Sequence, residues 1–175
     1  MYEVEVKVRA AHEPVREALS AAGAEERGTV TQVDVYYDHP TREFGETDEA
    51  LRVRREQKGS AETVELTYKG PLVEEASKTR REVETEVEDG DALGDILDAV
   101  AFERAATVEK ERTRFSLSGY TVTLDSVAGL GEFVEVETEA ETIEPAREGA
   151  FEILERLGLD PNDQLRTSYL GLLLE

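Results

Sequence analysis

The feature that most constrains this chain is an alternation of polar and apolar residues with a period of two. The run YEVEVKVR (residues 2–9) places Glu3, Glu5 and Lys7 on one side of an extended chain and three valines on the other. A helix repeats every 3.6 residues and would mix these two classes on its surface. Because further segments show the same alternation and glycine-containing breaks separate them, the sequence predicts a mainly β domain.

Eight segments carry this strand-like pattern, and four others read as helices. The predicted strands cover Tyr2 to Arg9, Thr29 to Asp38, Ala50 to Gln57, Ala61 to Lys69, Arg80 to Glu88, Glu103 to Phe115, Tyr120 to Ser126 and Glu132 to Ala140. The predicted helices cover His12 to Ala22, Asp91 to Val100, Pro145 to Leu157 and Thr167 to Leu174. The helices are mostly amphipathic, so we expect them to close barrel ends or coat a barrel wall, without a chemical role.

Three tight turns are expected between neighbouring strands. Lys58-Gly59, Ser118-Gly119 and Gly129-Leu130-Gly131 each supply residues that tolerate positive φ between two strand-like runs. Such short connections join antiparallel partners. The strands they connect are therefore predicted to pair as hairpins.

Length and composition limit the classes of function. The 175 residues suit one domain over residues 1–175, and the lack of cysteine excludes a disulfide framework and a thiolate nucleophile. A formal net charge of −21 would repel nucleic acids and acidic membranes, so neither is an expected partner. No signal-peptide pattern or membrane-spanning apolar run is present, which predicts a cytoplasmic protein. The acidic excess is typical of salt-adapted proteins, in which dissolved ions screen the repulsion between carboxylates.

Basic residues fall on the same strand faces as the acidic ones. Arg52 and Arg54 share one face of their strand, and Lys110 and Arg112 share one face of theirs. An exposed strand face is one explanation, because surface charges there deter aggregation. However, three of the five lysines occupy such positions, which favours a binding site. The other charged residues on these faces are Lys7, Lys69, Arg80, Glu82, Glu84, Asp125, Glu135 and Glu137.

A closed barrel with an apolar exterior and a charged lumen would accommodate this pattern. Isolated charges in an apolar interior are strongly penalised, so the lumen must be wet and its charges paired. Carboxylates left over from that pairing suit Mg²⁺ or Mn²⁺, which prefer hard oxygen ligands. Arginine offers a planar fork and lysine a compact point charge, and this mixture suits the non-equivalent oxygens of a polyphosphate. The residues thus predict a metal-assisted site for a triphosphate-bearing small molecule.

An ordered set of short motifs resembles the CYTH superfamily, which includes class IV adenylyl cyclases and thiamine triphosphatases. Glu3-Val4-Glu5-Val6-Lys7 is similar to the ExExK signature of that superfamily. The closing Ser168-Tyr169-Leu170-Gly171-Leu172-Leu173 resembles the end of the cyclase-like archaeal and bacterial members. The motifs in between are Gln32-Val33-Asp34-Val35-Tyr36-Tyr37-Asp38, Leu51-Arg52-Val53-Arg54, Lys69-Gly70-Pro71, Lys78-Thr79-Arg80, Glu82 with Glu84, Lys110-Glu111-Arg112, Asp125 and Gly131-Glu132-Phe133-Val134-Glu135-Val136-Glu137.

The resemblance implies a closed eight-stranded antiparallel tunnel that binds divalent metal, Mg²⁺ or Mn²⁺, and grips a triphosphate. The implied metal ligands or their close supporters are Glu3, Glu5, Asp125, Glu135 and Glu137, with Glu82 and Glu84 as further candidates. The implied triphosphate contacts are Lys7, Arg52, Arg54, Lys69, Arg80, Lys110 and Arg112, of which Lys7 and Lys110 would also take part in catalysis.

The implied site does not decide the reaction. Attack by water would make a triphosphatase acting on thiamine triphosphate or tripolyphosphate, whereas attack by the ribose 3′-hydroxyl of ATP would give cyclic AMP and pyrophosphate. The resemblance favours the cyclase. A third possibility is a non-catalytic module that binds nucleotides or polyphosphates. A homodimer is expected by resemblance only.

Several conspicuous residues receive no chemical role. His12 and His39 lack the spacing of metal ligands and are expected to be exposed to solvent. Tyr36, Tyr37 and Tyr169 are expected to pack against neighbours and not to stack on a nucleotide base. No glycine-rich phosphate loop precedes any predicted helix.

Overall fold

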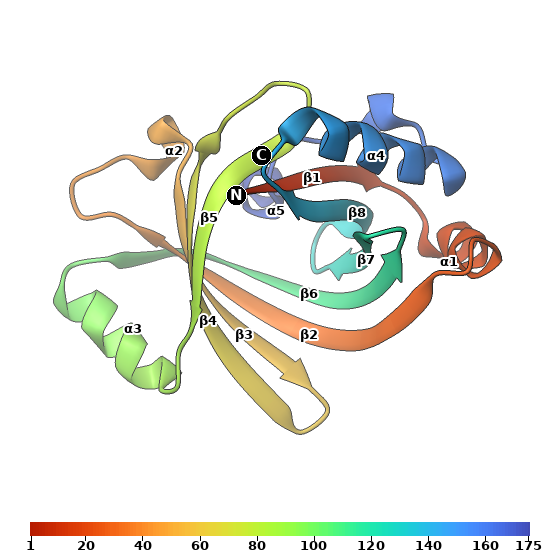
Figure 1. Cartoon of the computed structure of the whole chain (residues 1–175). Coiled ribbons are helices and arrows are strands. Elements are labelled where there is room, and N and C mark those ends of the chain that lie inside the picture. The colour runs from red at the N-terminus through yellow and green to blue at the C-terminus, as the bar shows by residue number, and fades with distance from the viewer.

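The computed structural model describes residues 1–175, and its central feature is a closed barrel of eight antiparallel strands (Figure 1). Around the barrel the strands follow the order β1-β5-β4-β3-β2-β6-β7-β8, and β8 pairs again with β1. The predicted eight-stranded barrel is therefore confirmed. Its strands are β1 (Tyr2–Arg9), β2 (Glu25–Asp38), β3 (Ala50–Lys58), β4 (Ala61–Leu72), β5 (Lys78–Glu86), β6 (Glu103–Leu117), β7 (Tyr120–Val127) and β8 (Gly131–Ala140).

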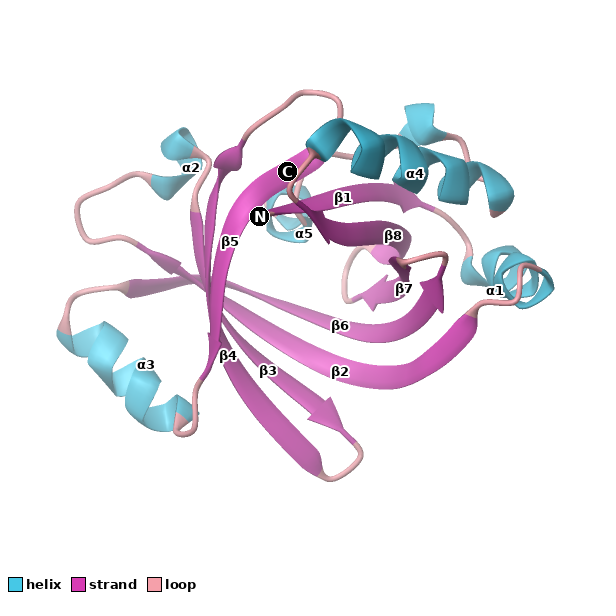
Figure 2. Cartoon of the chain, viewed as in Figure 1, coloured by secondary structure: helices cyan, strands magenta, loops and turns pink.

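Helices flank the barrel and lie outside its strands or at its ends (Figure 2). Two short elements, α2 and η1, were not predicted, because a single helical turn carries no readable periodicity. None of the helices combines the length and the hydropathy that a membrane span requires. The helices are α1 (His12–Ala21), α2 (Phe44–Thr47), α3 (Gly90–Ala99), α4 (Ile143–Arg156), the 3₁₀ helix η1 (Pro161–Asp163) and α5 (Tyr169–Leu173).

The strand ends and turns follow local chemistry. The hairpin between β6 and β7 turns at Ser118 and Gly119, both with positive φ, as a tight two-residue connection requires. Strand β2 begins at Glu25 instead of Thr29, because the pairing with β6 continues across a bulge at Gly28. Gly28 has a φ of 111°, which a residue with a side chain rarely adopts.

The apolar faces of the strands form the outer wall of the barrel. Helices α1 and α4 cover β1, β7 and β8, where Leu19 and Leu154 pack on strand residues such as Val6 and Val136. On another part of the wall, Leu97 of α3 joins a smaller apolar cluster with β3 and β4. The helices thus coat the barrel as predicted. Burying each such side chain contributes about 1.5–3 kcal/mol, so this packing fixes which strand face turns inward.

Helix α5 differs from the others because it enters the barrel end. Tyr169 packs with Val108, Val127 and Phe133, whose positions share the inward face of β6, β7 and β8. The rings of Phe133 and Tyr169 meet edge to face, with centroids 5.0 Å apart. One end of the lumen is therefore closed by apolar contacts, and the remaining interior is polar.

Candidate functional site

The inward strand faces enclose a cavity of about 460 Å³. Most of the residues that line it are charged, as the alternation along the strands predicted. Of the predicted site residues, only Lys7 and Asp125 lie outside its lining, buried beneath Tyr169. The charged lining residues are Glu3, Glu5, Asp48, Glu49, Arg52, Arg54, Glu65, Lys69, Lys78, Arg80, Glu82, Glu84, Lys110, Arg112, Arg114, Glu135 and Glu137.

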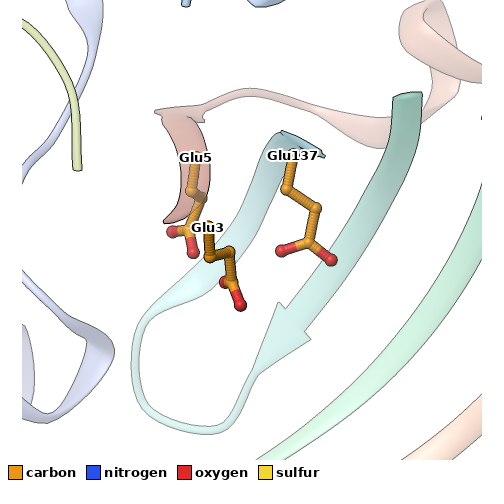
Figure 3. A group of neighbouring side chains, drawn as sticks. All are labelled: Glu3, Glu5 and Glu137. Atoms are coloured by element: carbon orange, nitrogen blue, oxygen red, sulfur yellow. The ribbon is translucent and has the colours of Figure 1, made fainter. Parts of the chain in front are cut away.

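Three predicted metal ligands come together on neighbouring strands (Figure 3). Carboxylate oxygens of Glu3, Glu5 and Glu137 all lie within 4.8 Å of one another. Glu5 on β1 is the register partner of Glu137 on β8, so strand pairing itself creates the group. These three residues, the carboxylate trio below, offer the hard oxygen donors that Mg²⁺ and Mn²⁺ prefer.

The carboxylate trio is electrostatically unfavourable in isolation. Burial, followed by the charge of Glu137, raises the pKa of Glu3 to about 10. Burial, followed by the charges of Glu135 and Glu5, raises the pKa of Glu137 to about 7. Like charges crowded at low dielectric favour protonation unless a cation compensates them. A divalent cation would supply that compensation, and the trio therefore fits such an ion.

On the opposite side of the barrel, Asp34 pairs with two basic side chains. Asp34 has no exposed surface, and its carboxylate accepts two hydrogen bonds from Arg54, at 2.7 and 2.8 Å, and one from Lys110 at 2.8 Å. Burial alone would raise the pKa of Asp34, but Arg54 and Lys110 outweigh it and hold the pKa well below its usual range. Asp34 thus fixes two of the predicted triphosphate contacts in place.

Asp125 and Glu135, predicted as metal ligands or their supporters, both pair with Arg112. The guanidinium donates to the two oxygens of Asp125 at 2.7 and 2.6 Å and to Glu135 at 3.0 Å. Tyr169 donates its hydroxyl to Asp125 at 2.7 Å. The structure therefore places Asp125 in an arginine network and outside the carboxylate trio, and gives both residues the role of orienting Arg112.

Two lysines lie close to the aromatic ring of Tyr169. The Nζ of Lys7 lies 4.2 Å from the ring centroid and has no hydrogen-bond partner, and the Nζ of Lys110 lies 5.5 Å from the same centroid. Burial, followed by the nearby Lys78, lowers the pKa of Lys7 to about 7, and burial with Arg54 and Arg112 lowers the pKa of Lys110 to about 7. Amines with pKa values near neutrality can hold or release a proton at physiological pH.

On the wall formed by β3, β4 and β5, the basic side chains also pair with acidic ones. Lys69 donates to Glu82 at 2.5 Å, and Arg52 donates to Thr67 at 3.1 Å and to Glu84 at 3.5 Å. Although burial opposes it, the Lys69 ammonium lowers the pKa of Glu82 to about 2. Glu82 and Glu84 are thus counter-ions of basic residues, and Glu82 also lies beside Glu3 of the carboxylate trio, where its charge helps to raise the pKa of Glu3.

The basic residue Arg80 is held by backbone oxygens. Its guanidinium donates to the carbonyl of Gly70 at 2.9 Å and to that of Asp48 at 3.3 Å. Gly70 belongs to β4 at the irregular pairing with β5, where the register shifts between Lys69 and Leu72. The irregularity presents a carbonyl to the arginine. Arg80 therefore needs no carboxylate partner at hydrogen-bond distance and lines the cavity as predicted.

Sequence reasoning missed Lys78 and Arg114 as lining residues. Lys78 donates to Glu5 at 3.1 Å, and Arg114 donates to Glu56 at 3.0 Å. The predicted strand starts at Arg80, two residues after Lys78, and so leaves Lys78 out. A strand extended to Lys78 places Lys78 and Arg80 on the same face. Arg114 follows Arg112 with the same period, which was a readable signal.

The expectation that both histidines are exposed was wrong. The His12 side chain is 12% exposed, because its Nδ1 pairs with Glu132 at 3.1 Å and its Nε2 lies 3.0 Å from the carbonyl oxygen of Phe133. His39 is half-buried, with its ring centroid 5.4 Å from that of Phe44 and 5.2 Å from that of Phe102. Neither histidine lines the cavity.

The three tyrosines separate into different environments. Tyr37 is buried in an apolar cluster, as expected of a packing residue. Tyr36 lines the cavity. Tyr169 packs against Phe133 but also contacts Lys7 and Asp125, so that helix α5, which was given no chemical role, contributes directly to the site.

Comparisons with known proteins agree with this geometry. The CYTH domain model matches residues 1–169. A protein of Methanocaldococcus jannaschii named "putative adenylate cyclase" is 34% identical and covers 98% of each chain. The solved PH1819 protein from Pyrococcus horikoshii is 41% identical over 98% of each chain, with a TM-score of 0.92. A Hippeastrum protein, named a putative adenylyl cyclase with a dominant triphosphatase activity, is 15% identical over 90% of this chain and 88% of its own, with a TM-score of 0.65; it shows the fold alone.

Proposed function

The chain belongs to the CYTH domain family, and we propose that it is a divalent-metal-dependent enzyme that acts on triphosphate-bearing small molecules. The leading reaction is the conversion of ATP to cyclic AMP and pyrophosphate. The observation that carries the proposal is the joint placement, in one lumen, of the carboxylate trio and a wall of arginines and lysines. A pure anion-binding protein would gain nothing from carboxylates beside phosphate oxygens unless a cation lay between them.

The two sets of residues would divide the work. Glu3, Glu5 and Glu137 would hold a divalent cation, which when bound would neutralise part of the charge on the phosphate oxygens. The basic side chains would bind the remaining phosphate oxygens and stabilise the charge that grows on the leaving group. The side chains proposed for this contact are Arg52, Arg54, Lys69, Arg80, Lys110 and Arg112, together with Lys7, which is completely buried beside Tyr169.

Pre-existing ion pairs support this role of the basic wall. Asp34 fixes Arg54 and Lys110, and Asp125 with Glu135 fixes Arg112, so that the donors are held in position before a substrate enters. Donors that need no reorganisation stabilise a developing charge more effectively than mobile ones. This arrangement supports catalysis by positioning and electrostatics, which is what phosphoryl chemistry requires of a protein.

In the proposed cyclisation, the ribose 3′-oxygen bonds to the α-phosphorus as the bond from that phosphorus to the bridging oxygen breaks, and pyrophosphate leaves. The 3′-hydroxyl must give up its proton to a base. Lys110 lines the cavity and has a pKa near 7, so its neutral form is a candidate acceptor. Apolar lining residues, Phe44, Leu170 and Leu174, would suit an organic group attached to the triphosphate.

Hydrolysis is the second candidate, and the substrates proposed for it are thiamine triphosphate and tripolyphosphate. The Hippeastrum protein with the same fold is named for a dominant triphosphatase activity, so the fold does not choose between the two reactions. In both reactions the same side chains would bind the phosphates. The reactions differ in the nucleophile that attacks phosphorus, which is water in hydrolysis and the ribose 3′-hydroxyl in cyclisation.

The test is a product analysis. The protein is incubated at high salt with Mg²⁺ or Mn²⁺ and, in parallel, with ATP, thiamine triphosphate and tripolyphosphate, and the products are resolved by ³¹P NMR. Cyclic AMP with pyrophosphate establishes the cyclase, and orthophosphate release establishes a triphosphatase and its substrate. Tight binding without turnover on any of the three would replace the enzyme with a binding module.

A further inference from the structure

Glu5 lies at the centre of a row of three charged side chains. On one side its register partner is Glu137 of β8, and on the other it is Lys78 of β5. The three side chains line the same cavity. Glu5 therefore belongs to the carboxylate trio and at the same time faces a lysine across the neighbouring strand pair.

The contact between Glu5 and Lys78 is a buried ion pair. The Nζ of Lys78 lies 3.1 Å from the Oε1 of Glu5, and the two side chains are 11% and 7% exposed. This is the one hydrogen bond that the Lys78 side chain makes. No second carboxylate lies within hydrogen-bond distance of Lys78, and the other nearby negative charge, Glu135, is itself held by Arg112.

No other ion pair of the molecule ends on the carboxylate trio. Lys110 and Arg54 pair with Asp34, and Lys69 pairs with Glu82. Arg112 is held by Asp125 and Glu135, which lie outside the trio. Occupation of the trio by a cation would therefore act first on one basic side chain, that of Lys78.

We propose that Glu5 keeps Lys78 in an ion pair in the metal-free protein, and that a divalent cation bound at the trio releases this lysine to bind a phosphate oxygen of the substrate. The cation and Lys78 compete for the charge of the same carboxylate, because attraction to a divalent ion exceeds attraction to an ammonium at similar distance. Lys78 is thereby a further substrate-binding residue, available in the metal-loaded protein. The inference rests on the proposed function, since it requires both a cation and a phosphate ligand.

The consequence is a thermodynamic coupling between the two ligands. A cation that frees Lys78 raises the affinity for the triphosphate, and the triphosphate raises the affinity for the cation by the same factor. The cation also contacts phosphate directly, so coupling is expected even without Lys78. The distinguishing quantity is the part of the coupling that disappears when Lys78 loses its charge.

The experiment measures equilibrium binding, without turnover, of Mn²⁺ by EPR and of the bis-methylene analogue of tripolyphosphate by calorimetry. The coupling factor is the dissociation constant of the analogue without Mn²⁺ divided by that with saturating Mn²⁺. It is determined for the wild type, Lys78→Met and Lys110→Met. Lys110→Met is the matched control, because it removes a lumen lysine whose partner, Asp34, is outside the trio.

Lys78→Met should lower the coupling factor by about fivefold or more, the low end of the range for coupled sites. It should also bind Mn²⁺ alone more tightly than the wild type, because Glu5 has lost its competing partner. Lys110→Met should weaken analogue binding with and without Mn²⁺ and keep the wild-type coupling factor. Lys78→Gln, which keeps a hydrogen-bond donor for Glu5 without the charge, should behave as Lys78→Met and serves if that variant fails to fold.

One result would overturn the inference while leaving the proposed function intact: a coupling factor in Lys78→Met and Lys78→Gln equal to that of the wild type. If the analogue affinity then falls equally with and without Mn²⁺, Lys78 is an unconditional phosphate contact. If the affinity does not change, Lys78 does not contact phosphate. A wild-type protein that binds the analogue but no Mn²⁺ would remove the metal site, and with it both the proposed function and this inference.

Discussion

Replacement of Asp34 by Asn tests whether the lumen is held together by paired charges. Asp34 is completely buried and accepts hydrogen bonds from both Arg54 and Lys110. The amide conserves the volume of the side chain but removes its charge, so two buried cations lose their shared counter-ion. Lys110, with a pKa already lowered to about 7, can lose its proton, whereas Arg54 cannot.

The expected cost follows from the burial of the pair. Breaking a buried ion pair by removing one partner destabilises a protein by about 3–5 kcal/mol, because the other charge remains in a poorly solvated place. In a domain of this size each kcal/mol lowers the melting temperature by about 2–4 °C. The Asp34→Asn variant should therefore melt about 6–20 °C below the wild type.

The assay is thermal unfolding followed by circular dichroism, at pH 7.5 and constant salt. The matched control is Glu25→Gln, an identical change of acid to amide in an exposed pair with Arg27 at 3.1 Å, which should change stability by no more than about 0.5 kcal/mol. Tripolyphosphate should stabilise the Asp34→Asn variant more than the wild type, because it would supply the missing negative charge. Equal melting temperatures for the two variants would refute the argument.

Three further predictions address the site and its supports. Burial and like charges raise the pKa of Glu137 to about 7, so the stability that its protonated form contributes is present below about pH 4.5 and is lost as the pH rises through 7. A bound cation compensates the ionised form, so Mg²⁺ should raise the melting temperature more at pH 8 than at pH 5.5. An equal rise at both pH values would contradict this. Tyr169→Phe keeps the ring near the two lysines but removes the hydroxyl that donates to Asp125. The variant should lose about 1.5–3 kcal/mol of unfolding free energy in urea, and no change would show that the hydrogen bond is dispensable. Gly149→Ala should destabilise by about 1–3 kcal/mol, because the new methyl group would overlap the Tyr120 hydroxyl. Gly94→Ala, also in a helix but uncrowded, should stabilise by about 0.5–1 kcal/mol, and the same sign for both variants would refute this packing effect.

Much of the barrel could be predicted because its signal is local. The parity of a residue such as Val6 or Glu5 predicts which face of its strand it occupies, and the two adjacent residues Ser118 and Gly119 predict the turn. Residues on one face of eight strands meet in one lumen once the barrel closes. The composition of the cavity wall therefore followed from the sequence.

The pairing inside the lumen could not be predicted, because it depends on which strands are neighbours and on their register. The placement of β5 beside β1 brings Lys78 to Glu5, and no local pattern encodes that choice. In the same way Asp125 meets Arg112 through the register of β6 and β7, and Tyr169 reaches Lys7 because α5 folds into the barrel end. The parity of residues along each strand predicts which charged side chains face the lumen, whereas tertiary contacts determine which acid pairs with which base.

Glu137→Gln tests whether the carboxylate trio binds a divalent cation that turnover requires. Mn²⁺ binding by EPR and Mn²⁺-dependent turnover of ATP and tripolyphosphate are measured together, with Glu155→Gln, an exposed position on α4 outside the cavity lining, as control. We expect Glu137→Gln to lose Mn²⁺ affinity and turnover by roughly 10–100-fold or more, since removal of even an outer-shell partner of a bound metal has an effect of that size, while Glu155→Gln retains both. Wild-type Mn²⁺ affinity and turnover in folded Glu137→Gln would show that the trio is not the metal site.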